Sequence, residues 1–477
     1  MIEEPEAAAS ICPQRANLPA VVEDSIAQDS LDFADYAFRL LKETRHPVFL
    51  TGRAGTGKST FLRKACRDLG KKYAIVAPTG IAAINVRGET IHSFFKVPFG
   101  PLRPGDPRVR ETRYDSAKRK VLESLELLVI DEVSMVRADL LDAVDDCLRR
   151  IRKVPEPFGG VQVLLVGDLL QLEPVARADE WAQISAYYET PFFFSARVVY
   201  EMDLIPIELE KVYRQSDPEF IGLLDRIRMG APTYDDMVLL NRRPPRPPHG
   251  QEDYSIVLTG RRDTASMTNE ERLRELPGKE KLFKGTVSGD FPRSHLPTEK
   301  ELRLKPGAQV IFVRNDPPPF RRWVNGTLGV VESIEYDEEI DQEVVWVRLR
   351  DDTIYKVERV RWENIKFRSE KGQIKEEVVG FFDQLPLRLA WAVTIHKSQG
   401  LTFERAVVDL GNGAFASGQL YTALSRVTAM EGLYLKRKIR RRDAMAHQDV
   451  LDYYDTMNDI QAIQRILDGD EEEQRQA

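Results

Sequence analysis

The stretch GRAGTGKS runs from Gly52 to Ser59, directly behind the apolar run Val48 to Leu50 and Thr51. After it, apolar residues recur at helical spacing until Gly70 ends the pattern. A glycine-rich turn between a buried strand and an amphipathic helix is the setting in which this motif binds phosphate groups. A glycine-rich surface turn, the alternative interpretation, would not need either neighbour. The stretch therefore predicts a nucleotide site in an α/β fold.

The residue types in this stretch each have a physical role at a phosphate site. Glycines let backbone N–H groups wrap the phosphates, and the dipole of the following helix adds attraction. Lys58 is expected to neutralise the β and γ oxygens, while the Ser59 hydroxyl coordinates magnesium. The expected nucleotide contacts are Gly52, Ala54, Gly55, Thr56, Gly57, Lys58, Ser59 and Thr60.

Two adjacent acids, Asp131 and Glu132, follow the apolar run Leu127 to Ile130. An exposed acid pair usually has no function, but the carboxyl end of a buried parallel strand lies at a ligand crevice. We expect Asp131 to hold magnesium together with Ser59. We expect Glu132 to position and deprotonate the attacking water.

Further apolar runs, Tyr73 to Ala77 and Val161 to Val166, alternate with helical patterns, which predicts a parallel sheet. A second alternating unit is expected to start at the run Ile205 to Leu209. Between Phe283 and Gly380, short strands separated by turn residues predict an all-β insertion. The predicted organisation is a flexible segment 1–30, a first domain 31–204 with a small insertion at about 95–120, a second domain 205–282 and 381–464, the β insertion 283–380, and an acidic tail 465–477.

Composition indicates a globular intracellular protein. The chain has 477 residues, 30% of them charged, and it has no long uncharged apolar run and no basic-then-apolar leader. Its three cysteines, Cys12, Cys66 and Cys147, are too scattered for a zinc site or a disulfide framework. The net charge of −7 is concentrated in segments 1–30 (net −5) and 468–477 (net −4), which leaves the body at +2. Nucleic acid is therefore not excluded as a partner, since it needs only a local basic groove.

Several segments, the P-loop and the acid pair among them, resemble superfamily 1B helicases, most closely the Pif (petite integration frequency) family. The segments are GRAGTGKST, APTGIAAINVRGETIHSFF, DEVSM, GDLLQLEPV, VYRQSD, AWAVTIHKSQGLTFE and YTALSRVT. The resemblance covers Phe33 to Leu435, and Glu132 to Arg152 looks like the sequence that separates this family from its RecD-like cousins. It implies an α/β fold of two RecA-like P-loop domains with parallel sheets, and a small all-β barrel inserted in the second domain.

The resemblance also implies roles for individual residues. Gln171 would sense the γ-phosphate, and Arg214 and Arg426 would reach it from the second domain, where bidentate arginines stabilise the charge of phosphoryl transfer. Gly400 and Glu404 would line the nucleotide side of the second domain. The implied DNA contacts are Thr79, Asn85, His92, Thr259, His396 and Lys397. Phe94 and Phe95 have two interpretations, stacking on bases or packing beneath the motif.

The chain departs from the family pattern at two places. No Gln precedes the P-loop to read adenine, and Glu173 stands where a second Pro is usual. The barrel resembles a Src-homology-like domain, and the insertion near Pro101 would be a wedge arm. The basic run KRKIRRR, Lys436 to Arg442, is open to three interpretations: a DNA contact, a nuclear import patch or a solvated edge.

The resemblance implies an ATP- and magnesium-dependent helicase that moves 5′ to 3′ on single-stranded DNA and opens duplex, forks and G-quadruplexes. We expect a monomer that has no membrane partner. Its expected location is the cytoplasm, as for bacterial or phage members of the family, and the nucleus is the alternative. A RecD-like exonuclease subunit and a relaxase-linked helicase are rivals of the same class. An alternative from another functional class is a nucleotide-dependent switch or kinase-like P-loop NTPase that does not unwind DNA. A last alternative is a degenerate chain with only a structural role.

Overall fold

The computed structural model describes residues 31–248, 254–316, 320, 322–370 and 373–476. The predicted flexible segment 1–30 lies outside the described residues. Short helices of 3-10 type connect many elements: η1 (Val133–Met135), η2 (Pro157–Gly160), η3 (Phe193–Ser195), η4 (Arg197–Glu201), η5 (Arg293–His295), η6 (His396–Ser398), η7 (Met430–Gly432) and η8 (Arg441–Asp443).

A first sheet of six strands, all parallel among the described residues, has the order β3-β2-β4-β5-β1-β6. Its strands are β1 (Val48–Gly52), β2 (Tyr73–Ala77), β3 (Glu89–Thr90), β4 (Leu127–Ile130), β5 (Gln162–Val166) and β6 (Ile205–Leu209). Nearly every strand residue is buried, as is usual for a parallel sheet covered on both faces. The predicted α/β fold class is confirmed.

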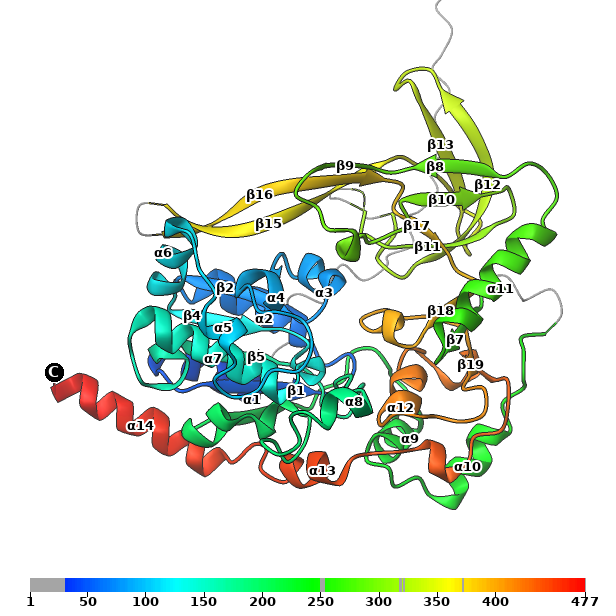
Figure 1. Cartoon of the computed structure of the whole chain (residues 1–477). Helices are drawn as coiled ribbons and strands as arrows, with labels where there is room; N and C mark the ends of the chain where they lie inside the picture. Colours follow the sequence, from blue (N-terminus) through cyan, green and yellow to red (C-terminus); the bar gives the residue numbers. More distant parts are fainter. Residues whose placement is uncertain (1–30, 249–253, 317–319, 321, 371–372, 477) are drawn as a thin grey trace, which may run out of the picture.

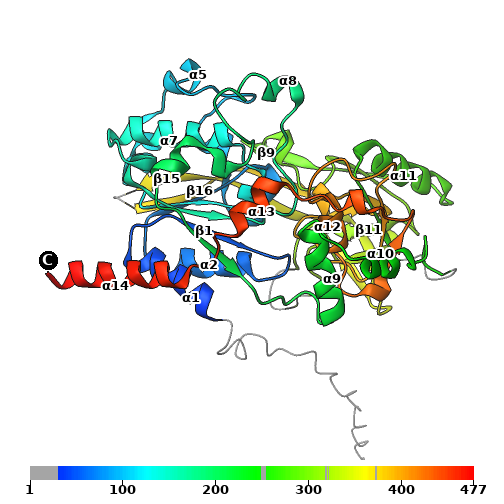
Figure 2. The ribbon, with the colours of Figure 1, turned by 90° about the horizontal axis from the view of Figure 1, so that it is seen from below.

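Helices cover both faces of this sheet, as Figure 2 shows. The helices of this part are α1 (Leu31–Glu43), α2 (Lys58–Asp68), α3 (Gly80–Asn85), α4 (Ile91–Phe94), α5 (Pro107–Arg110), α6 (Ser116–Ser124), α7 (Ala138–Arg152) and α8 (Ala178–Trp181). One core lies between the sheet and α1 and α2, and the other lies beneath α4, α6 and α7. The apolar residues Leu140, Leu141, Val144, Leu148 and Ile151 of α7 are buried in the second of these cores.

A second parallel sheet has the order β18-β7-β19-β20. Its strands are β7 (Ile256–Thr259), β18 (Ala392–Thr394), β19 (Ala406–Asp409) and β20 (Leu433–Leu435), and the helices around it are α9 (Pro218–Arg228), α10 (Tyr234–Asn241), α11 (Arg262–Glu275) and α12 (Gln419–Leu424). Its core is separate from the two cores of the first sheet. Below, the units built on the two sheets are called the first and the second part.

Strand β6 corrects one predicted boundary. The run Ile205 to Leu209 was expected to open the second unit, but it pairs along the whole of β1, with Val48 opposite Ile205 and Gly52 opposite Leu209. The chain therefore leaves the first part only after Leu209. A short apolar strand has the same sequence pattern in either sheet, so its alternation could not assign it.

The C-terminal residues correct a second boundary. Helices α13 (Gln448–Tyr454) and α14 (Ile460–Gln476) were expected to belong to the second domain or to an acidic tail. Instead, the Tyr454 hydroxyl lies 2.8 Å from Thr51 Oγ1 in β1, and Leu467 is buried against α1. The end of the chain thus returns to the first part, and residues 465–476 are helical.

The stretch between α11 and β18 forms antiparallel sheets, as the predicted all-β insertion requires. Its strands are β8 (Lys281–Lys284), β9 (Thr286–Gly289), β10 (Glu301–Leu304), β11 (Gln309–Phe312), β12 (Leu328–Asp337), β13 (Gln342–Arg348), β14 (Ile354–Val357), β15 (Val360–Glu370), β16 (Gln373–Gln384) and β17 (Leu387–Leu389). Because β17 pairs with β11, the insertion extends past the predicted end at residue 380.

The hairpin β15–β16 spans from this insertion across the first part and reaches α6 (Figure 1). There the Phe367 ring packs edge-on against Phe94, with centroids 5.9 Å apart, and the Phe367 N–H donates to Glu89 Oε1 at 2.8 Å. Nearer the body of the insertion, His295 of η5 touches Gly80 of α3. The carboxyl edge of the first sheet thus lies under the insertion.

Candidate functional site

The loop Gly52 to Ser59 joins β1 to α2 in the setting that the sequence predicts. Gly55 has a φ of 86°, and a Cβ on it would come 2.5 Å from Arg214 Cβ, so any side chain there would both strain the loop and strike the facing segment. Thr56 is buried and donates to the Arg53 carbonyl, whereas Ser59 and Thr60 are exposed in the first turn of α2. The Ser59 hydroxyl is therefore accessible to a ligand.

Lys58 curls back onto its own loop. Its Nζ donates to the carbonyls of Gly52 at 2.6 Å and Arg53 at 3.0 Å. Burial lowers the pKa of Lys58, and the charges of Asp168 and Glu132 oppose that effect. A buried ammonium held mainly by carbonyl dipoles gains most from a fully charged anion, which is what a nucleotide phosphate supplies.

Asp131 and Glu132 follow β4 at its carboxyl end. Burial and the neighbouring Glu132 charge raise the pKa of Asp131 to about 7, and burial also raises the pKa of Glu132. Glu132 takes a left-handed backbone with φ of 51°, which is uncommon outside glycine. Two carboxyls with raised pKa values form a site that a divalent cation would stabilise.

Gln171 is buried behind β5, and its Nε2 donates to Asp168 Oδ2 at 3.0 Å. Burial alone would raise the pKa of Asp168, but the charges of Arg228 and Lys58 hold it below its usual range. Asp168 therefore stays ionised and fixes the orientation of the Gln171 amide. The structure thus brings Gln171 to the same group of charges as Lys58.

Arg214 and Arg426 reach this group from outside the first sheet. Arg214 follows β6 and donates to the Ser425 carbonyl at 3.2 Å, while Arg426 follows α12 and donates to the Thr422 carbonyl at 2.9 Å. Burial and the Arg214 charge lower the pKa of Arg426 to about 9. Arg426 is buried and Arg214 is half-buried. Two neighbouring guanidiniums held largely by neutral groups leave positive charge that an anion in the cleft would balance.

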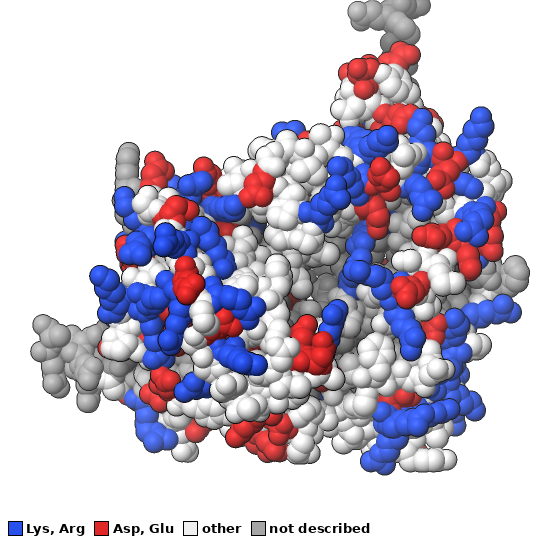
Figure 3. Space-filling model, in the orientation of Figure 1, with Lys and Arg blue, Asp and Glu red and all other residues white. Residues whose placement is uncertain are grey.

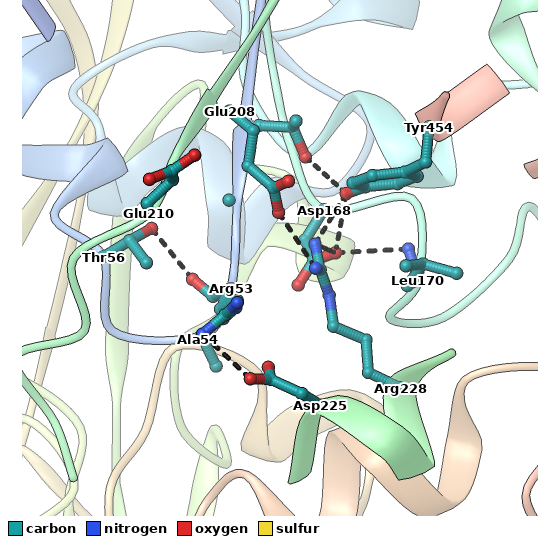
Figure 4. A network of polar contacts seen from close by, with 12 residues as sticks. Arg53, Ala54, Thr56, Asp168, Leu170, Glu208, Glu210, Asp225, Arg228 and Tyr454 are labelled. Carbon is teal, nitrogen blue, oxygen red and sulfur yellow. Dashed lines mark hydrogen bonds and ion pairs between the residues drawn. The ribbon is translucent and has the colours of Figure 1, made fainter. Parts of the chain in front are cut away.

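Sequence reasoning gave no role to four residues beside this site: Asp168, Arg228, Tyr421 and Tyr454. Figure 4 shows the network that three of them form, with Arg228 between Asp168, Glu208 and Tyr454. Asp168 stands inside the quoted segment GDLLQLEPV, so a signal for it was present. Arg228 reads only as a basic residue in the last turn of a helix, and nothing in its local sequence marks its role.

Gly400 and Glu404, the other two predicted nucleotide contacts, lie in the segment between η6 and β19. Gly400 is exposed after η6, and the Glu404 carboxylate is exposed and pairs with Arg350 of the insertion. Their nucleotide contacts remain a prediction. Glu173, the departure from the family pattern, is half-buried, and burial raises its pKa.

The predicted DNA contacts of the first part lie along its sheet edge. Thr79 and Asn85 are exposed at the two ends of α3, and Thr79 caps that helix. His92 stacks on Phe99 with ring centroids 4.3 Å apart, and burial lowers its pKa. Phe94 and Phe95 are fully buried, so they pack beneath the motif and the base-stacking alternative is wrong in this structure.

In the second part, Thr259 ends β7 and is buried, while His396 and Lys397 lie in η6 after β18. Burial, together with Arg388, lowers the pKa of Lys397 to about 8. These residues therefore lie at the carboxyl edge of the second sheet. Figure 3 shows a hollow at the centre of this face of the molecule, with Lys and Arg side chains along its right-hand wall.

The basic run Lys436 to Arg442 is folded into the second part. Arg437 pairs with the buried Asp443 at 3.0 Å, Lys436 pairs with Asp409 at 2.7 Å, and Ile439 is buried. Asn241 also fixes the Ile439 backbone through two hydrogen bonds. Only some of the cations in the run are available to a partner.

No helix among the described residues combines the length and apolar character needed to cross a membrane.

Comparison with known proteins now adds to this geometry. The profile of the PIF1-like helicase family matches residues 34–233. The ATP-dependent DNA helicase PIF1 of Danio rerio is 35% identical over 423 residues, which cover 85% of this chain and 61% of that protein. The ATP-dependent DNA helicase Pif1 of Bdellovibrio bacteriovorus is 33% identical over 397 residues, covering 81% of this chain and 83% of that protein.

The Pif1 helicase of Bacteroides has been solved in several states. Its complex with ADP-AlF4 has a TM-score of 0.82 and 35% identity, and its complex with ADP-AlF3 and single-stranded DNA has a TM-score of 0.65 and 36% identity. Each comparison covers 90% of this chain and 97% of the solved chain. The chain spans less than two thirds of the length of the vertebrate relatives it matches, such as 61% of the Danio rerio protein. The similarity extends over nearly the whole of the solved Bacteroides chain and most of the Bdellovibrio protein. This chain therefore belongs to the PIF1-like helicase family.

Proposed function

We propose that this chain is an ATP-dependent DNA helicase that moves 5′ to 3′ on single-stranded DNA and separates duplex. One observation carries the proposal: Arg214 and Arg426 converge on the P-loop from beyond the first sheet, and Arg426 is only 1% exposed. Because two parts of the chain contribute to one site, a change at the γ-phosphate alters how the parts fit together. The direction of movement rests on the family resemblance.

In this proposal, the first RecA-like domain comprises the first sheet with its helices and the returning α13 and α14. The second comprises the sheet β18-β7-β19-β20 with α9 to α12. Lys58, Arg214 and Arg426 stabilise the charge of the transferred phosphoryl group, Gln171 senses it, and Glu132 takes a proton from the attacking water. Gly400 and Glu404 line the nucleotide side of the second domain.

The donor set at the P-loop fits magnesium, which binds through few protein ligands and keeps phosphate and water oxygens. The Ser59 hydroxyl is exposed. Burial and the Glu132 charge raise the pKa of Asp131 to about 7 against the opposing Lys58 charge, so a divalent cation there would stabilise the ionised carboxylate. Magnesium bound there would neutralise phosphate charge. Ser59 and Asp131 would hold it.

DNA is proposed to run along the carboxyl edges of both sheets, over Thr79, Asn85 and His92 and then over Thr259, His396 and Lys397. Small polar groups and cations there suit phosphate contacts, which carry no sequence information. The Bacteroides complex with single-stranded DNA supports this substrate. Forked DNA and G-quadruplexes are further proposed substrates.

Part of this track is covered in the present arrangement. His295 contacts Gly80 beside Thr79, and the β15–β16 hairpin is docked on α4. The TM-score is 0.82 to the Bacteroides complex with ADP-AlF4 and 0.65 to the complex with ADP-AlF3 and single-stranded DNA, so the arrangement of this chain is closer to the former. We infer that the insertion must shift before a strand occupies the whole track.

One copy of the chain supplies the whole proposed nucleotide site, because Arg214 and Arg426 come from the same chain as the P-loop. A monomer is therefore sufficient for hydrolysis. We also propose a cytoplasmic location, since the folded state of the run Lys436 to Arg442 does not favour the alternative of a nuclear import peptide. Imaging a fluorescent fusion of the chain tests this location.

The decisive experiment is ATP-driven strand separation on duplexes with only a 5′ tail or only a 3′ tail, with Lys58→Ala as control. We expect unwinding of the 5′-tailed duplex alone and its loss in the variant, because the P-loop loses its phosphate cation. Unwinding of the 3′-tailed duplex would reverse the direction. ATP hydrolysis that ignores DNA, without unwinding, would favour the nucleotide-dependent switch.

A further inference from the structure

Arg228 is the last residue of α9, and its side chain leaves the core of its own part. The helix packs by Phe220, Leu224 and Ile227 into the core around the second sheet. The Arg228 guanidinium instead contacts groups of the first part. Its Nη1 lies 2.9 Å from Glu208 Oε1 in β6 (Figure 4). The side chain is thus a bridge between the two parts.

The second terminal nitrogen, Nη2, lies 3.2 Å from Oδ1 of Asp168. Arg228 is 4% exposed and Asp168 2% exposed, so this pair has been removed from water. A buried charge is tolerated only when it is paired, and here each partner belongs to a different part of the molecule. The pair therefore forms when the two parts close and is lost when they separate.

Asp168 passes this contact on to the nucleotide site. While Oδ1 meets Arg228, Oδ2 accepts the hydrogen bond from Gln171 Nε2. One amide hydrogen and the carbonyl oxygen of Gln171 remain for a phosphate or a water. The orientation of that amide therefore depends on a carboxylate that Arg228 holds.

A second branch leads to the P-loop. Arg228 Nη2 donates to the Tyr454 hydroxyl at 2.7 Å, and that hydroxyl lies 2.8 Å from Thr51 Oγ1, one residue before the loop begins. The guanidinium also lies 4.8 Å from the centre of the Tyr454 ring. Returning α13 thus connects Arg228 with the strand that enters the phosphate site.

A separate ion pair shows that this end of α9 is a docking surface. Arg53 in the P-loop pairs with Asp225 at 2.9 Å, one turn before Arg228. In this pair the cation comes from the first part and the anion from α9, the reverse of the Arg228 pairs. Opposite polarity at two adjacent contacts fixes the register in which the two parts meet.

We propose that Arg228 is a positioning residue for ATP hydrolysis. When the two parts close, it fixes Asp168 and, through Asp168, the Gln171 amide. Through Tyr454 it also fixes the start of the P-loop. The inference deepens the proposed function and rests on it. No contact between Arg228 and nucleotide is required. Its effect should therefore fall on turnover in the closed state more than on the binding of ATP.

The test compares Arg228→Lys and Tyr454→Phe with the control Arg226→Lys in the full chain. Lys keeps the charge of Arg228 but not the fork that contacts two partners, and Phe removes only the Tyr454 hydroxyl. Arg226 lies on the same helix but pairs with Asp236 inside the second part. ATPase kcat and KM with single-stranded DNA are measured for each, with the thermal midpoint of unfolding.

For Arg228→Lys we expect a DNA-stimulated kcat lower by about tenfold and a KM for ATP within about twofold, the effect of one lost charge-assisted hydrogen bond. For Tyr454→Phe we expect a loss of about threefold in kcat, again with little change in KM. Arg226→Lys should match the wild type. A merely structural role would not lower kcat while leaving the KM for ATP nearly unchanged.

The inference is overturned if Arg228→Lys changes only KM or only the unfolding midpoint, or if Arg226→Lys loses as much kcat. Should Arg228→Lys fail to fold, an unchanged kcat in Tyr454→Phe overturns the inference and a selective loss supports it. A wild-type chain without DNA-stimulated ATPase would instead refute the proposed function. The two failures are therefore distinguishable.

Discussion

The backbone N–H of Ala54, inside the P-loop, donates a 3.1 Å hydrogen bond to the hydroxyl of Tyr421 on α12. Both residues are buried, and Arg426 follows α12 two residues after its end. One hydroxyl therefore ties the phosphate loop to the helix that positions Arg426. The contact exists only while the two parts of the chain are together.

Removing this hydroxyl with Tyr421→Phe should weaken closure by about 1 kcal/mol, the net value of a typical hydrogen bond. Because this hydroxyl bonds to the phosphate loop itself, whereas Arg228 contacts residues outside that loop, we expect the KM for ATP to rise about fivefold while kcat changes little. Tyr434→Phe, a buried tyrosine of β20, is the matched control. Steady-state ATPase assays check this. An unchanged KM would show that the hydroxyl does not contribute to closure.

Arg426→Ala should slow hydrolysis by about a thousandfold, at the lower end of what a phosphate-contacting arginine contributes to phosphoryl transfer. The fold should survive, because the change removes a buried positive charge that lies beside the like charge of Arg214. Single-turnover hydrolysis with saturating ATP and DNA measures the effect. Hydrolysis near the wild-type rate would remove Arg426 from the transition state and leave it a structural cation.

The pH dependence follows from Asp131, whose pKa burial and the Glu132 charge raise to about 7. An acid with a raised pKa is protonated below that value, so protons then compete with magnesium for the carboxylate. We expect the magnesium concentration needed for half-maximal ATPase to rise by up to about tenfold for each pH unit below 7. Titrating magnesium at several pH values checks this. A requirement that does not change with pH would exclude Asp131 as a ligand.

The phosphate site could be predicted from sequence because its main parts are local. The P-loop needs one strand, eight residues and one helix, and Asp131 needs only the strand before it. The placement of β6 could not be predicted in this way. Its residues Ile205 to Leu209 have a pattern that suits either sheet, and only their pairing with β1 decides between them.

Contacts distant in sequence were also beyond prediction. Tyr454 lies 403 positions from Thr51, to which it is hydrogen-bonded, and no periodicity connects the two. Arg228 likewise depends on partners in β6, behind β5 and in α13. The nucleotide contacts of Gly400 and Glu404, which the family resemblance implies, stay predictions, and the pairing of Glu404 with Arg350 of the insertion had no signal in the local sequence. Local motifs identify chemistry, whereas the fold decides which motifs meet.

The hairpin β15–β16 offers a test of how DNA gains access to its track. Phe367 is 3% exposed and packs on Phe94, so truncation to alanine should remove much of the apolar contact that docks the hairpin on the first part. If a strand must displace the insertion, Phe367→Ala should bind single-stranded DNA about tenfold more tightly, because less docking free energy is lost on binding. Val378→Ala, an exposed apolar residue of β16, is the control. Fluorescence anisotropy at fixed salt measures affinity, and circular dichroism confirms folding. Unchanged or weaker binding by a folded Phe367→Ala variant would show that the hairpin does not restrict the track, and that DNA enters without releasing it.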